Sequence, residues 1–269
     1  MNNEKYIGVF DSGIGGLTVV KSIVESMPNE NIIYFGDTAH VPYGTRSKEQ
    51  IIEYVLNDVK FLSSFDIKAI VIACNTADAS ARETVIEKYP DIPVFGVVEP
   101  ASKKAALATK NNKIGVIATN ATVDSGSYEK NIAKYNPDAE VFSVACPLLV
   151  PLVENGRYKK GDNVIEKVLD EYLSVLKEKQ IDTLVLGCTH YPLLYDIIAD
   201  IMGNEVQIIS SSVAAAETLK NGLESRSLLK HTPISERKYF VSDNAEHFEK
   251  QALIFMGDSL GGTVGQVDI

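Results

Sequence analysis

The chain has 269 residues, of which 45% are apolar and 23% charged, so it is long enough to bury a sizeable core as one large domain or two modest ones. This composition excludes a disordered or collagen-like protein. A net charge of −10 without a basic run argues against nucleic acid as a partner, and apolar runs too short for a membrane span indicate a cytoplasmic protein.

Short runs rich in β-branched residues recur along the chain, each of a length that suits a buried strand. In chain order they read YIGVF, NIIYFG, AIVIAC, PVFGVV, KIGVIA, EVFSVAC, TLVLGC, VQIIS and KYFVS. Stretches with helical period lie between most of them, including 46–65, 77–89 and 163–179. Because strands and helices alternate, we predict an α/β fold with mainly parallel sheets covered by helices.

Two parts of the chain repeat the same order of features. An Ile-Gly-Val strand at residues 7–9 is echoed at 114–116, and each half later has an apolar strand that ends in a cysteine, Cys74 or Cys188. The glycine of each strand precedes its cysteine by 66 residues in the first half and by 73 in the second. The repeat predicts two similar, pseudo-symmetric α/β domains with the active site in the cleft between them.

The domain boundaries follow from this repeat. No Gly/Ser-rich linker separates the two halves, so we expect a tight join near Glu99 and a return to the first unit near Ser210. Residues 1–98 plus 210–269 would form the domain that carries Cys74, and residues 99–209 the domain that carries Cys188.

Cys74 and Cys188 are the first candidates for chemistry, since ligands of open α/β sheets bind beyond the carboxyl ends of the strands. We expect a helix to begin after each, and a helix N-terminus lowers the pKa of a thiol from its usual value of about 8.5. The alternative for each is a small buried apolar residue, but matching positions in a repeat favour reactivity.

Cys146, in VACPLL, lacks polar neighbours and is expected in the core. All three cysteines should be free thiols.

The segment VFDSGIGGLTV places an acid, a hydroxyl and three glycines after the first strand. It invites comparison with a dinucleotide-binding fingerprint, with Asp37 near the position of a ribose-binding acid, but the third glycine of that motif is missing. The other functional interpretation is that the glycines let the backbone approach a small anion while Asp11 and Ser12 point into the site. A tight turn capped by Asp11 is the structural alternative.

His190, two residues after Cys188, and Asp11 from the opposite unit are the natural partners for proton transfer. A C-x-H pair with one distant cysteine is not a recognised metal-ligand spacing, so we predict no metal site. Further polar side chains near predicted helix starts could hold carboxylates or simply cap helices; they are Asn75, Thr76, Thr119, Thr122 and Thr189.

Several segments, in order, carry a resemblance to a known family. DSGIGGLTV, YFGDTAHVPYG, ACNTADA, VVEPA and LGCTHYPLL, followed by YFVSDNAEHFEKQALIFMG, are similar to the signature blocks of the glutamate racemases, in the aspartate/glutamate racemase superfamily. The resemblance covers nearly the whole chain. It implies an isomerase that interconverts L- and D-glutamate without any cofactor and supplies D-glutamate for peptidoglycan synthesis, and thus for cell-wall biogenesis and cell shape.

The resemblance also implies roles for particular residues. Cys74 and Cys188 would flank the substrate Cα, one removing its proton and the other returning a proton to the opposite face. Asp11 would assist Cys74, and His190 would assist Cys188 with Glu154 as a further acidic candidate. The loop at residues 41–44 would lie over the cleft. The implied substrate-binding residues are Asp11, Ser12, Tyr43, Gly44, Asn75, Thr76, Thr119, Thr122, Thr189 and His190.

Alternatives stay open at this point. An aspartate or related amino-acid racemase of the same superfamily is the nearest, and a two-lobed binding protein without catalysis or an NAD-binding oxidoreductase follows. We expect a small-molecule substrate, glutamate, with neither nucleic acid nor membrane as a partner; a homodimer is an open alternative. Some family members answer to a cell-wall precursor through an N-terminal extension, which we do not expect in a chain with five residues before Tyr6.

Overall fold

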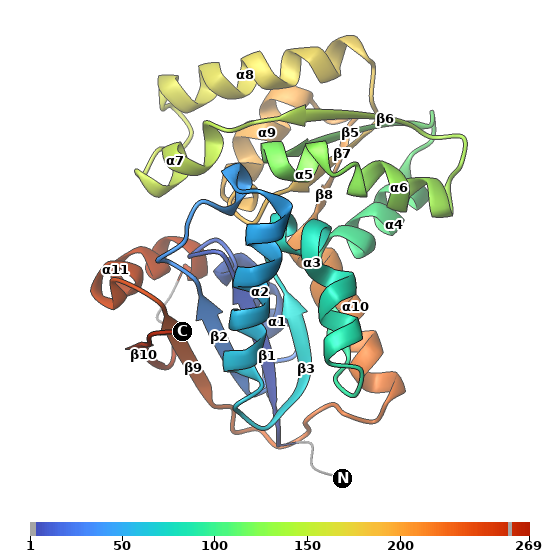
Figure 1. Ribbon diagram of the computed structural model, residues 1–269. Helices are drawn as coiled ribbons and strands as arrows, with labels where there is room; N and C mark the ends of the chain where they lie inside the picture. Colours follow the sequence, from blue (N-terminus) through green and yellow to red (C-terminus); the bar gives the residue numbers. More distant parts are fainter. Residues whose placement is uncertain (1–3, 258–259) are drawn as a thin grey trace.

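A computed structural model describes residues 4–257 and 260–269, and these residues form two lobes, each built on one sheet (Figure 1). The first lobe has a six-stranded sheet in the order β10-β9-β2-β1-β3-β4, and the second lobe has a four-stranded sheet in the order β6-β5-β7-β8. Every strand pair in the described residues is parallel. The prediction of an α/β fold with two parallel sheets is therefore confirmed.

The two sheets share one topology, as the internal repeat predicts. β1 lies between β2 and β3 in the first sheet, and β5 lies between β6 and β7 in the second. β4 and β8 each extend their sheet beyond the third strand. The strands are β1 (Tyr6–Asp11), β2 (Ile32–Gly36), β3 (Ile67–Ile72), β4 (Val94–Phe95), β5 (Lys113–Ala118), β6 (Glu140–Ala145), β7 (Thr183–Gly187), β8 (Gln207–Ser210), β9 (Arg237–Val241) and β10 (Thr263–Gln266).

Helices cover the sheets and connect the parallel strands, as such connections require. The three stretches with the clearest helical period are α2, α3 and α8, whose bounds differ from the predicted ones by at most three residues. The helices are α1 (Leu17–Ser26), α2 (Lys48–Leu62), α3 (Asn75–Lys88), α4 (Val98–Ala108), α5 (Asn120–Asp124), α6 (Ser127–Tyr135), α7 (Leu149–Glu154), α8 (Asn163–Glu178), α9 (Tyr195–Met202), α10 (Ser211–Ser225) and α11 (Ala245–Met256), with 3₁₀ turns η1 (Tyr43–Thr45) and η2 (Tyr191–Leu194).

Strand membership bears on the predicted domain boundaries. The first sheet takes its strands from residues 6–95 and 237–266, and the second from residues 113–210. This membership supports a division into 1–98 plus 210–269 and 99–209, which stays a proposal. The sequence prediction missed β10, because its four residues include Gly265 and show no apolar periodicity.

The second lobe shows how the helices are held against the sheets. α8 begins at the cap Asp162, whose side chain accepts a hydrogen bond from the Val164 backbone N–H, and it buries one apolar stripe against the sheet. The stripe consists of Ile165, Leu169, Leu173 and Leu176, all fully buried. Packing of this stripe, more than helix propensity, stabilises the helix.

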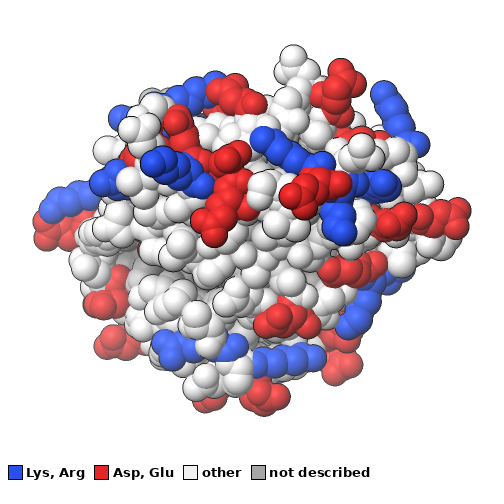
Figure 2. All heavy atoms as spheres, turned by 90° about the horizontal axis from the view of Figure 1, so that it is seen from above, with Lys and Arg blue, Asp and Glu red and all other residues white. Residues whose placement is uncertain are grey.

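One face of the molecule mixes charges of both signs. Seen from above the view of Figure 1, Lys and Arg side chains are interspersed with Asp and Glu (Figure 2).

Within the residues that the structure describes, no helix is both long and apolar enough to cross a membrane.

Replacing Leu169 by Ala should lower the free energy of unfolding by about 2–5 kcal/mol, because it opens a cavity in a fully buried stripe. Val175→Ala on the same helix is the control: Val175 is 48% exposed, and its replacement should change stability by less than about 0.5 kcal/mol. Urea denaturation of both variants measures the difference. Equal stabilities would contradict the packing of α8 described here.

Candidate active site

A cavity of about 320 Å³ lies between the two lobes, at the carboxyl ends of strands from both sheets. Its walls come from the segments that follow β1, β2, β3, β5, β6 and β7. Ligands of open α/β sheets bind at this end of the strands. The lining residues are Ser12, Gly13, Val41, Pro42, Tyr43, Gly44, Thr45, Cys74, Asn75, Thr76, Thr119, Asn120, Pro147, Val150, Pro151, Glu154, Cys188, Thr189 and His190.

Cys74 lies at the start of α3, where the chain passes from β3 into the helix. Its thiol donates a hydrogen bond to the Ser12 hydroxyl, with 3.6 Å between Sγ and Oγ. Burial and the charge of Asp11 raise the pKa of Cys74 to about 12, against the lowering effect of the Ala77 backbone N–H. The expectation of a lowered pKa at this helix start is wrong, because loss of water outweighs the helix terminus.

Cys188 follows β7, but no α-helix begins there. The chain turns through Thr189 and His190 into the 3₁₀ turn η2, in which Pro192 is the second residue. The helix α9 starts only at Tyr195. The expectation of a helix start directly after Cys188 is therefore wrong. Because the turn brings the ring of His190 back toward the thiol, a side chain takes the place of a helix N-terminus beside Cys188.

Cys188, His190 and Glu154 form a connected chain of polar groups. The distance from Cys188 Sγ to His190 Nδ1 is 3.9 Å, and that from His190 Nε2 to Glu154 Oε1 is 3.0 Å. Burial opposes a charge on His190, but the hydrogen bonds to Cys188 and Glu154 raise its pKa to about 10. The imidazole is thus a cation at neutral pH, held between the sulfur and a carboxylate that is itself 41% exposed.

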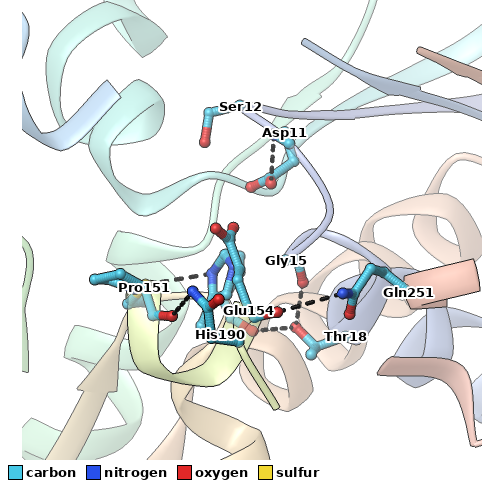
Figure 3. Close-up of polar contacts among 12 residues, drawn as sticks. Asp11, Ser12, Gly15, Thr18, Pro151, Glu154, His190 and Gln251 are labelled. Atoms are coloured by element: carbon cyan, nitrogen blue, oxygen red, sulfur yellow. Dashed lines mark hydrogen bonds and ion pairs between the residues drawn. The ribbon is translucent and has the colours of Figure 1, made fainter. Parts of the chain in front are cut away.

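Asp11 and Ser12 lie on the opposite side of the site from Glu154 and His190 (Figure 3). Asp11 is buried; its Oδ2 accepts a hydrogen bond from the Gly13 backbone N–H at 3.0 Å, while its Oδ1 has no protein partner. Burial raises the pKa of Asp11, although His190 and backbone N–H groups lower it. The capping interpretation accounts for one carboxylate oxygen, and Asp11 lies in the layer behind the cavity lining.

Three hydroxyl groups meet where α3 and α5 approach each other across the lobes. Thr76, Thr119 and Thr122 lie 2.9 to 3.2 Å apart, oxygen to oxygen. Neither Cys74 nor Thr119 caps its helix with a side-chain hydrogen bond, so capping does not explain this arrangement. Thr76 and Thr119 line the cavity, and Thr122 supports them from behind.

Asn75 and Thr189 complete the polar wall. Asn75 is buried, and its Oδ1 accepts a 2.6 Å hydrogen bond from Tyr128, while its amide nitrogen has no protein partner. Thr189 also lines the cavity, between Cys188 and His190. The structure therefore brings every predicted site residue to the cavity or into the layer directly behind it.

The segment from Val41 to Gly44 forms one wall of the cavity, with a cis Val41–Pro42 peptide bond. The Tyr43 hydroxyl points away from the cavity, to Asp37 and Asp58, so a bound molecule would meet only the backbone or ring of Tyr43. Asp37 is fully buried and already accepts several hydrogen bonds from protein groups. It therefore cannot bind a ribose, as the acid of a dinucleotide-binding motif would.

The two lobes touch closely beside the Cys188 segment. A Cβ atom on Gly15 would lie 2.3 Å from Thr189 Oγ1 and 2.5 Å from His190 Nδ1, so only glycine fits. The Thr18 hydroxyl, on α1, lies 2.9 Å from the Thr189 carbonyl oxygen and 3.0 Å from the Ser212 hydroxyl. These contacts fix the glycine loop of the first lobe against the segment of the second lobe that carries Cys188 and His190.

Some residues of the site escaped the sequence analysis. Pro147, Val150 and Pro151 form an apolar wall, although their run looks like ordinary core in the sequence. Gln251 of α11 donates to the Glu154 carbonyl oxygen at 3.3 Å, and a contact between positions so far apart leaves no local signal. Cys146 is buried and lies outside the lining, as predicted. Among the described residues, no group of three or more Cys, His, Asp or Glu side chains is placed to hold a metal ion.

Comparisons with known proteins agree with one another. A sequence model of the Asp/Glu/Hydantoin racemase family matches residues 7–219. A glutamate racemase of Geobacter metallireducens is 46% identical over 96% of this chain and 94% of its own length. A glutamate racemase of Enterococcus faecalis is 42% identical over 96% of this chain and 94% of its own length.

Solved structures give the same result. A glutamate racemase isoform of Bacillus anthracis has a TM-score of 0.94 at 38% identity, covering 99% of this chain and 98% of that one. A Francisella tularensis glutamate racemase in complex with D-glutamate has a TM-score of 0.92 at 39% identity, with the same coverage. An aspartate racemase of Picrophilus torridus, at 19% identity and a TM-score of 0.56, shares the fold alone.

The charge on His190 can be measured directly. Nitrogen-15 spectra of the histidine rings should show His190 as imidazolium at pH 8, with a midpoint near 10. Glu154→Gln should lower that midpoint, because it removes the carboxylate that stabilises the cation. The charge contributes stability that is complete below pH 6.5 and is lost as the pH rises toward 10.

Glu246→Gln, an exposed change on α11, serves as the control and should leave the His190 titration unchanged. A His190 ring that is neutral at pH 7 would contradict the ion pair with Glu154.

Proposed function

The chain belongs to the Asp/Glu/Hydantoin racemase family, and on that basis we propose that it is a glutamate racemase, an isomerase that interconverts L- and D-glutamate with two cysteines and no cofactor. One observation carries the proposal: two thiols, from equivalent strand ends of two similar lobes, line one small cavity. The full-length similarity to glutamate racemases supports the choice of substrate.

Inversion at Cα needs two proton carriers. The proton leaves one face of the carbon and another proton arrives on the opposite face, so one group can serve only one direction. A thiol suits the task because it is intrinsically reactive even though only a few per cent of free cysteine is ionised at neutral pH. A pair that holds one proton between its members is ready to act in one direction and, after turnover, in the other.

The surroundings of the two sulfurs support a defined starting state. Beside Cys188 lies His190, with 3.9 Å between Sγ and Nδ1, so the ring can exchange a proton with the sulfur. Cys74 donates a hydrogen bond to Ser12, which is the role of a protonated thiol. In this state Cys188 takes the Cα proton of L-glutamate, and Cys74 gives its proton to the opposite face to form D-glutamate.

The reset step returns the proton from Cys188 to Cys74 through solvent and neighbouring groups. Glu154 joins the buried His190 to water, since one of its oxygens bonds Nε2 while the carboxylate is partly exposed. On the other side, burial and the charge of Asp11 raise the pKa of Cys74, which makes its thiolate a stronger base for D-glutamate. Asp11 and Ser12 are also the groups that would hold the ammonium group of the substrate.

The remaining polar groups suit the two carboxylates of glutamate. Hydroxyls of Thr76 and Thr119, the Asn75 amide and backbone N–H groups at the start of α3 offer donors within one cavity. Fixed donors in a site sheltered from water stabilise the charge that develops when Cα loses its proton. D-glutamate formed in this way would supply peptidoglycan synthesis.

Cys74→Ala and Cys188→Ala should each abolish racemisation, because one face of Cα loses its proton carrier. The control is Cys146→Ala, a buried thiol outside the cavity, which should keep the activity and lose only packing energy. A chiral assay of the dialysed enzyme, without added cofactor, measures all three variants. Full racemase activity in either of the first two would refute the two-base mechanism.

A half-reaction separates the roles of the two thiols. With a glutamate analogue that expels a leaving group once Cα is deprotonated, Cys74→Ala should consume only the L-enantiomer and Cys188→Ala only the D-enantiomer. The reverse pattern would mean that Cys74 deprotonates L-glutamate and Cys188 deprotonates D-glutamate, and the two-cysteine mechanism itself would stand.

Glutamate should be favoured over aspartate by at least about tenfold in kcat/KM, since a site set for the longer side chain gains about 1–3 kcal/mol from one methylene. Competition between the two amino acids in one racemisation assay measures this ratio. Equal turnover would favour the alternative, an aspartate or broader amino-acid racemase.

A further inference from the structure

Two buried carboxyl groups meet the same tyrosine hydroxyl behind the wall of the cavity. Tyr43 Oη lies 2.6 Å from Asp37 Oδ2 and 3.1 Å from Asp58 Oδ2. Asp37 follows β2, Asp58 lies on α2, and both side chains are fully buried. This cluster of Asp37, Tyr43 and Asp58 lies outside the reacting groups described above.

If both acids are ionised, the cluster has too few hydrogen atoms to make both of its short contacts hydrogen bonds. The Tyr43 hydroxyl has one hydrogen to donate, and two carboxylate oxygens lie within its reach. The shorter contact marks Asp37 as the acceptor. The second contact is then a hydrogen bond only if Asp58 has a proton to donate to the tyrosine oxygen.

The partners of the two acids differ in the same sense. Asp37 accepts further hydrogen bonds from the Ser242 hydroxyl at 2.8 Å and from His40 Nδ1 at 2.8 Å, so both of its oxygens are surrounded by donors. Asp58 has no partner other than Tyr43 among the described residues, and its Oδ1 is buried without a hydrogen bond. A buried charge in that setting would be costly, whereas a neutral acid leaves only a carbonyl oxygen unpaired.

We propose that Asp58 is a protonated positioning residue, which donates a hydrogen bond to Tyr43 so that Tyr43 can donate to Asp37 and hold the segment Val41–Gly44 at the cavity. That segment faces the second lobe closely: a Cβ on Gly44 would lie 3.0 Å from Thr119 Cβ. Asp58 acts through Tyr43 and touches no substrate. Its effect on turnover rests on the proposed racemase function, whereas its protonation does not.

Burial, followed by the charge of Asp37, raises the pKa of Asp58 well above its ordinary value of 3.8. The titratable groups that act on Asp58 are Asp37 after β2, Tyr43 of η1 and Asp11 at the end of β1. Around the rest of the cluster lie Cys74 before α3, His40 after β2, and Tyr54 on α2, which stacks on His40. An acid whose pKa is higher in the folded state destabilises the fold as the pH rises above its unfolded value. The sign of this effect gives a test that needs no substrate.

Asp58→Asn replaces a protonated acid by a neutral amide of the same shape. The melting temperature of the variant relative to the native protein should rise by at least about 4 °C between about pH 5 and pH 8, because only the native protein has the titrating group. The matched control is Glu53→Gln, an exposed carboxyl-to-amide change on the same helix, which should show no such trend. A flat difference for Asp58→Asn, or failure of this variant to fold, would overturn the proposal.

Kinetics test the positioning role. Asp58→Asn should keep kcat/KM within about threefold, whereas Asp58→Leu and Tyr43→Phe should raise KM by about tenfold or more with a smaller change in kcat. Equal kinetics in Asp58→Asn and Asp58→Leu would overturn the role of the hydrogen bond. If the native protein did not racemise glutamate, the proposed function would fall, and the melting experiment would still decide the protonation of Asp58.

Discussion

The whole site depends on how closely the two lobes meet beside Cys188. Gly15 lies so near to Thr189 and His190 that a methyl group would collide with both, and the Thr18 hydroxyl bonds to the Thr189 carbonyl oxygen. A cavity between two lobes keeps its dimensions only if the lobes are held in register. The glycine loop after β1 therefore does more than shape a turn, because it sets the position of one thiol relative to the other.

Pseudo-symmetry places the two thiols, and departures from it make them different. β3 and β7 hold equivalent positions in their sheets, so both cysteines reach the same cavity. One then leads into an α-helix beside a buried acid, and the other into a turn that carries a cation. Equivalent strand ends with different electrostatic surroundings suit the proposed mechanism, in which the two sulfurs share one proton.

The sequence predicted much of this because the relevant signals are local. Apolar runs ending at Cys74 and Cys188 revealed strand ends, and the repeated order of elements revealed two related sheets. The errors arose where distant residues decide the outcome. The pKa of Cys74 rises because the surrounding core removes water from the thiol and because the charge of Asp11 lies nearby. The strand β10 forms because β9 offers a free edge to a weak strand.

The sequence by itself determined the α/β class, the parallel sheets, the family, the two cavity cysteines and most of the polar residues that line the cavity, since these follow from periodicity, composition and short motifs. Only the tertiary structure decided the state of those residues. The cation on His190, the raised pKa of Cys74 and the Asp37, Tyr43 and Asp58 cluster depend on burial and on partners far apart in the chain. Desolvation and hydrogen bonding are properties of a packed environment, which no single stretch of sequence contains.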